Sequence, residues 1–128
     1  MLTNLNSILQ KAYAEKYAVG SFNAYNFETF KGIIDAGVET NTSIIVAFGA
    51  KYLTNMSVET ASAIVTSLAK DLEIPVCLHL DHCKSMDTVY TAIKAGFGSV
   101  MYDGSALPFA ENVANTAQIC KVAHACGV

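Results

Sequence analysis

The sequence predicts an α/β fold built on a parallel sheet, on the basis of three observations. Four short apolar runs alternate with longer amphipathic stretches. The runs are continuously apolar rather than alternating, which is typical of parallel strands that helices cover on both faces. The runs also recur at regular intervals, each followed by one helical stretch. Right-handed crossovers allow an open doubly wound sheet or a closed (β/α)8 barrel, and this regularity favours the TIM barrel.

The apolar runs and the stretches between them define the expected elements. We expect strands at residues 17–22, 43–48, 75–80 and 99–103, and helices at residues 4–16, 27–39, 57–68, 85–95 and 109–125. Gly96 follows the fourth helical stretch, as a glycine commonly follows a helix. The chain thus supplies an N-terminal helix and about the first four βα units of a barrel that needs eight.

Residues 1–128 are expected to form a single, partial TIM-barrel domain. Four parallel strands alone leave two unpaired edges, which favour association with another chain. Three possibilities stay open: part of a longer barrel, which we favour, two copies that close a barrel between them, or an open sheet.

The composition indicates a globular protein and disfavours some partners. The chain is 52% hydrophobic and 15% charged, which is unlike a disordered segment. All eight basic residues are lysine and the net charge is −3, so the arginine-rich basic stripe of a nucleic-acid-binding protein is missing. No apolar run approaches the roughly 18 residues of a membrane span, and the first residues do not resemble a signal peptide. We expect a cytoplasmic protein with no nucleic-acid or membrane partner.

The four cysteines do not indicate a metal site or a disulfide framework. Cys77, Cys83, Cys120 and Cys126 include no CxxC pair, and other candidate ligands do not repeat with zinc-finger spacing. We expect buried or inert reduced thiols.

The motif LHLDHC at residues 78–83 is the strongest candidate for chemistry. Side chains alternate along a strand, so His79 and Asp81 share one face while Leu78 and Leu80 share the other. Asp81 and His82 stand where the strand ends, and active sites of parallel α/β folds lie at this end. An imidazole binds zinc and a carboxylate moves protons, but a catalytic zinc usually needs three protein ligands.

Two other strands end with polar residues that we expect at the same rim. Asn23 follows the first apolar run, and Asp103 is the last residue of the fourth. Taken singly, an aspartate in this position is often a helix N-cap and an asparagine is often a turn residue. His79 is expected one layer below Asp81, and His124 is expected to be an exposed residue near a helix C-terminus.

Four segments together resemble the class II, metal-dependent ketose-bisphosphate aldolases, typified by fructose-bisphosphate aldolase. They are VGSFNAYN (19–26), IPVCLHLDHCKS (74–85), AIKAGFGSVMYDGSALPFAENVANT (92–116) and KVAHACGV (121–128). They occur in the family's order and cover nearly the whole chain. The resemblance implies the N-terminal half of a zinc-dependent lyase of glycolysis and carbohydrate metabolism.

The resemblance also implies roles for individual residues. Asp81 matches the family's catalytic proton donor, and His82 matches its first zinc ligand. Asp103 matches a ligand of an additional metal position, and Asn23 matches an asparagine that contacts the substrate. The implied cofactor is Zn²⁺, which acts as a Lewis acid so that no Schiff-base lysine is needed.

The resemblance is incomplete after the second strand and in the second half of the barrel. Ala47 and Gly49 stand where many members have a polar residue or serine that holds substrate. The remaining zinc histidines and the phosphate-binding loops belong to the second half, so we expect this chain to be inactive alone.

The implied reaction is reversible cleavage of fructose 1,6-bisphosphate to dihydroxyacetone phosphate and glyceraldehyde 3-phosphate. The alternatives are tagatose bisphosphate or another ketose bisphosphate, and a non-catalytic, self-associating half-barrel that binds a phosphorylated metabolite. We expect a phosphorylated sugar as substrate and a homo-oligomer, either a dimer or a tetramer.

Overall fold

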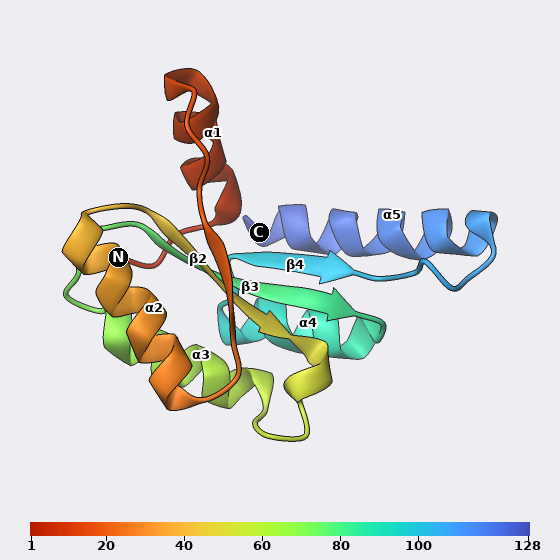
Figure 1. Cartoon of the computed structure of the whole chain (residues 1–128). Coiled ribbons are helices and arrows are strands. Elements are labelled where there is room, and N and C mark those ends of the chain that lie inside the picture. Colours follow the sequence, from red (N-terminus) through yellow and green to blue (C-terminus); the bar gives the residue numbers. More distant parts are fainter.

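A computed structural model describes all 128 residues and shows four parallel strands alternating with helices (Figure 1). The elements are α1 (Leu5–Glu15), β1 (Ser21–Ala24), α2 (Phe27–Thr40), β2 (Ile44–Gly49), the 3-10 helix η1 (Ala50–Tyr52), α3 (Val58–Ala69), β3 (Val76–Cys83), α4 (Met86–Ala95), β4 (Ser99–Tyr102) and α5 (Phe109–Ala125). The strand order β1-β2-β3-β4 follows the chain, and every neighbouring pair is parallel. This arrangement of an N-terminal helix and four βα units is the one the sequence predicts.

The helices α2, α3 and α4 cover one side of the sheet, while α1 stands apart from them (Figure 1). The main core lies between these helices and the strands, and it includes Val46, Phe48, Leu78 and Leu80, all at most 1% exposed. We call the opposite side of the sheet the inner face. It carries the alternate residues of β2 and β3, and α1 covers only its amino end.

Local signals explain where the helices begin and end. Ser57 and Ser85 accept hydrogen bonds from the backbone amides three residues later and so cap α3 and α4. Gly96 ends α4 with φ of 98°, a left-handed conformation that suits glycine. The last helix, α5, has the predicted bounds, 109–125.

Two strand predictions differ from the structure by more than one residue at an end, while those at 43–48 and 99–103 agree to within one residue. The first strand is Ser21–Ala24 and not 17–22, because Lys16 takes a left-handed conformation after α1 and Val19 packs on the small cluster of Ile8, Ile45 and Cys77. The third strand continues to Cys83 instead of ending at residue 80.

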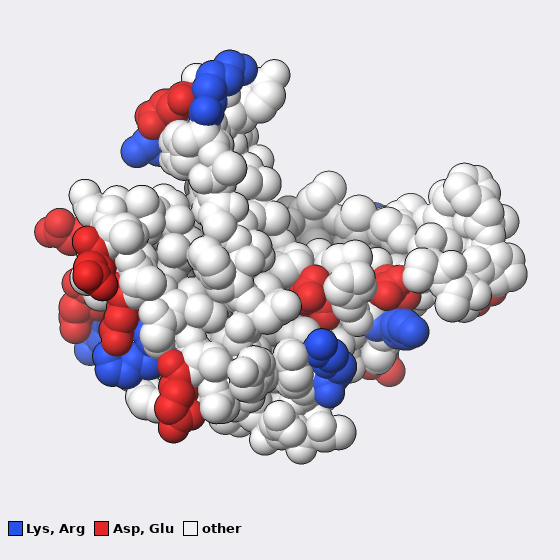
Figure 2. All heavy atoms as spheres, viewed as in Figure 1, with Lys and Arg blue, Asp and Glu red and all other residues white.

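Charged side chains are dispersed over the surface that Figure 2 shows, and the lysines there form no continuous stripe. None of the helices combines the length and hydropathy that crossing a bilayer requires.

Candidate active site

The carboxyl end of β3 is distorted in a way that brings Asp81 and His82 to the surface. The pairing of β3 with β4 shifts register between Leu80 and Cys83, which marks a β-bulge. Within it, His82 has φ of 50°, in the left-handed region that non-glycine residues rarely adopt. Strained backbone of this kind is concentrated at functional sites.

Asp81, His82 and Asp103 lie together at this end of the sheet. His82 Nδ1 is 3.2 Å from Asp103 Oδ2, and His82 Nε2 is 3.9 Å from Asp81 Oδ1. The His82 side chain is 64% exposed, while the two carboxylates are 28% and 15% exposed. The structure thus brings together three of the four predicted site residues, around an imidazole that solvent and ligands can reach.

Asp103 is held as an ionised carboxylate. The Ser105 hydroxyl, the His82 ring and the Ser105 backbone amide all bond to it and lower the pKa of Asp103 to about 2. Because an ionised carboxylate only accepts hydrogen bonds, His82 donates through Nδ1. The Nε2 lone pair of His82 is then free to bind a metal, the arrangement that is common for metal-binding histidines.

The fourth predicted residue, Asn23, lies on the inner face but one level lower than expected. The strand register pairs Asn23 with Ala47 and Ala47 with His79, whereas Asp81 pairs with Gly49. Asn23 therefore shares the row of His79, two residues before Asp81 along the strands.

The two aspartates do not cap helices, and His124 lies where the sequence predicts. Ser85 caps α4 and Pro108 precedes α5, so neither Asp81 nor Asp103 is a helix N-cap. His124 lies exposed in the last turn of α5, as predicted.

Two serines at this site were not identified from the sequence. Ser105 follows Asp103 by two residues, a spacing at which an aspartate often bonds the chain ahead of it, and this could have indicated the contact. Ser99 bonds His79 Nδ1 across 2.8 Å, but only the register of β3 and β4 brings them together.

The donor set partly fits a zinc ion. Imidazole nitrogen and carboxylate oxygens are zinc ligands, and the His82 ring lies within 4 Å of both the Asp81 and the Asp103 carboxylates. No group of three histidine, cysteine, aspartate or glutamate side chains is arranged to hold a metal ion. A zinc site would therefore use His82 with further ligands from outside this cluster.

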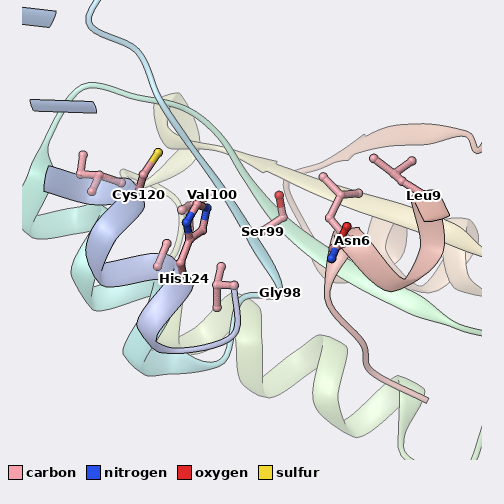
Figure 3. Close-up of a pocket in the computed structure, with 11 residues that line it drawn as sticks. Asn6, Leu9, Gly98, Ser99, Val100, Cys120 and His124 are labelled. Atoms are coloured by element: carbon pink, nitrogen blue, oxygen red, sulfur yellow. The ribbon is translucent and has the colours of Figure 1, made fainter. Parts of the chain in front are cut away.

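A groove of about 510 Å³, which Ser99 helps to line, runs between α1 and α5 along β4 (Figure 3). Seven of its eleven lining residues are hydrophobic, and it includes neither Asp81 nor His82. Its titratable lining residues are His124 and Cys120 only, so its size does not mark it as the site of chemistry.

Comparison with known proteins identifies the family. Residues 3–128 match the family described as "Fructose-bisphosphate aldolase class-II". The chain belongs to this family of lyases, as the sequence motifs predict.

Individual relatives differ in the substrate that they are named for. The chain is 40% identical over 129 residues to the fructose-bisphosphate aldolase of Helicobacter pylori strain 26695. This match covers 100% of the chain and 42% of that protein. It is 39% identical over 122 residues to the sulfofructosephosphate aldolase of Alkalicoccus urumqiensis, covering 95% of the chain and 42% of that protein. The chain thus spans about two fifths of the length of these relatives.

Solved structures confirm the fold. The chain superposes on the YdjI aldolase of Escherichia coli K12 with a TM-score of 0.91 and 34% identity, covering 100% of the chain and 50% of that protein. The Campylobacter jejuni fructose-bisphosphate aldolase gives a TM-score of 0.87 at 23% identity, covering 99% and 45%. The four βα units are therefore part of the TIM barrel of class II aldolases.

Proposed function

We propose that this chain supplies the proton-transfer residue and the first metal ligand of an aldolase that cleaves fructose 1,6-bisphosphate to dihydroxyacetone phosphate and glyceraldehyde 3-phosphate. The observation that carries the proposal is the cluster of Asp81, His82 and Asp103 at the carboxyl end of the sheet, in a chain of the class II aldolase family. Active sites of (β/α)8 barrels lie at this end.

Each residue has a distinct proposed role. Asp81, partly buried beside His82, moves the proton at the hydroxyl of the bond that is cleaved. His82 offers Nε2 to zinc, with Asp103 either orienting the ring or binding a second metal position. Bound zinc would supply Lewis-acid stabilisation of the charge that develops on the substrate carbonyl oxygen. Asn23, on the same face, contacts the substrate.

The identity of the sugar is the finer part of the proposal. The similar proteins include both a fructose-bisphosphate aldolase and a sulfofructosephosphate aldolase, at nearly equal identity. The sugars share an anionic group and a ketose carbonyl, so the same proton transfer serves both. Fructose 1,6-bisphosphate is our first choice, with tagatose bisphosphate and sulfofructose phosphate as alternatives.

A chimeric enzyme tests the proposal. Residues 1–128 replace the matching segment of the Helicobacter pylori enzyme, and cleavage of the three sugars is measured with zinc present. We expect cleavage of fructose 1,6-bisphosphate and a loss of about 10²–10⁴-fold in kcat for Asp81→Asn, the usual contribution of a positioned proton-transfer group.

A folded, zinc-loaded chimera that cleaves none of the sugars would contradict the proposal. It would favour the alternative of a non-catalytic half-barrel that associates with itself and binds a phosphorylated metabolite. The cytoplasmic location and the homo-oligomeric state stay predictions.

A further inference from the structure

We propose that His79 is a positioning residue for Asp81, and that Ser99 holds the His79 ring in the tautomer that carries its proton on Nε2. This inference rests on the proposed role of Asp81 in proton transfer. It adds two residues, one from β3 and one from β4, to the machinery of that site.

The first observation is a polar pair inside the sheet. His79 is 16% exposed at its side chain, Ser99 is 8% exposed, and His79 Nδ1 lies 2.8 Å from Ser99 Oγ. Replacing both partners of a buried hydrogen bond by apolar groups of the same shape is often nearly neutral or stabilising, so the stability of the fold does not require a polar pair here. The neighbouring inner-face positions Ala47 and Cys77 are apolar, so the sheet does not require a polar pair at this level.

The second observation is the direction of the other ring nitrogen. His79 Nε2 lies 3.8 Å from Asp81 Oδ1. This is longer than a hydrogen bond, but bonds of catalytic groups are often long without substrate and shorten in the complex. Burial lowers the pKa of His79, with Asp81 opposing and His82 reinforcing this shift, so the ring is neutral with a single N–H.

The hydrogen-bonding capacities of the three groups then fix the tautomer. A carboxylate accepts hydrogen bonds, so a His79 ring that bonds to Asp81 through the facing Nε2 carries its proton there. The Nδ1 atom of His79 then accepts from the Ser99 hydroxyl, whose proton has no other partner within hydrogen-bond distance. The series Ser99, His79 and Asp81 thus points its donors in one direction, toward the Asp81 carboxylate at the carboxyl end of the sheet.

The tautomer is measured directly on this chain by ¹⁵N NMR of the histidine rings. We expect the His79 ring to be protonated at Nε2, and Ser99→Ala to convert it to a mixture of tautomers. Ser62→Ala is the matched control, because Ser62 is 6% exposed and donates to the Ala95 carbonyl across 2.6 Å, away from the site. An Nδ1-protonated ring in the unsubstituted chain, or equal effects of the two serine variants, would overturn the proposal.

Kinetics of the chimeric enzyme supply the second readout. The side-chain amide of His79→Gln can donate to Asp81 as Nε2–H does, whereas His79→Leu cannot donate. We expect kcat to fall about tenfold further in His79→Leu than in His79→Gln, with KM similar; this is smaller than the roughly 10²–10⁴-fold contribution of a group that transfers the proton itself. Equal losses in both variants would show a merely structural role. If the unsubstituted chimera is inactive, the proposed function fails, while the NMR result still decides the tautomer.

Discussion

The two faces of the sheet have opposite characters although the same strands form both. Facing the helices, Val46, Leu78 and Leu80 are at most 1% exposed and belong to one apolar core. On the inner face of β3, the strand that carries Leu78 and Leu80, His79 and Asp81 are polar and partly exposed. Because side chains alternate along a strand, residues that stabilise the fold and residues that carry chemistry are immediate neighbours in sequence. Substitutions on the two faces should therefore have separable effects.

Along β3 the inner face changes from buried and apolar at Cys77 to polar and partly exposed at Asp81. The reactivity of the Cys77 thiol should show that the amino end is closed to water. Burial raises the pKa of Cys77, on the inner face, to about 12, and it also raises the pKa of Cys83, which lies in the main core; Cys120 and Cys126 are exposed. Since the thiolate is the nucleophile, and an ordinary cysteine has a pKa near 8.5, the thiolate fraction of Cys77 at pH 8 is on the order of 10³ lower.

Iodoacetamide labelling at pH 8, followed by mass spectrometry, checks this prediction. We expect rapid labelling of Cys120 and Cys126, and labelling of Cys77 only when the chain unfolds or the pH rises toward 12. Rapid labelling of Cys77 in the folded chain would mean that the amino end of the inner face is open to water.

The helix-facing side should dominate stability. Phe48→Ala removes a fully buried ring that stacks on Phe30 with 6.1 Å between centroids, and we expect a loss of about 3–5 kcal/mol in the free energy of unfolding. Phe22→Ala is the matched control, because Phe22 is 51% exposed on β1. Urea unfolding compares the two variants. Phe22 pairs with Val46 on the same side of the sheet as Phe48, so equal losses would contradict the claim that burial in the helix-facing core dominates stability.

The backbone at His82 provides the smallest and most local test. A left-handed residue other than glycine costs about 1–2 kcal/mol, so His82→Gly should be about 1 kcal/mol more stable than His82→Ala. The same pair of substitutions at Thr66, an exposed position in α3, should give the opposite order, since glycine destabilises a helix. If alanine is the more stable at both positions, the strain at His82 is absent.

Much of the fold follows from local patterns in the sequence, but details at the site depend on the tertiary structure. The predicted helix 109–125 is confirmed, and capping by Ser85 and Gly96 agrees with the expected start and end of α4. The predicted start of β1 was wrong because Val19, although apolar, lies outside the strand and packs against the cluster of Ile8, Ile45 and Cys77. An apolar side chain fits either place, and the sequence does not distinguish them.

The candidate site shows the same division. The positions of Asp81, His82 and Asp103 at one edge follow from parallel strands whose carboxyl ends meet there. The level of Asn23 and the pairing of His79 with Ser99 depend on strand register, which is set by contacts between distant parts of the chain. The bulge that turns His82 outward depends equally on how β3 meets β4.

The most direct test of the metal-binding role of His82 is the zinc content of the chimeric enzyme. Atomic absorption and the cleavage assay are applied to the unsubstituted chimera, His82→Ala and Asp103→Asn. If His82 is a zinc ligand, His82→Ala loses both zinc and cleavage, while Asp103→Asn weakens zinc binding by about 10–100-fold if it only orients the ring. A folded His82→Ala chimera that keeps its zinc and its activity would contradict the account.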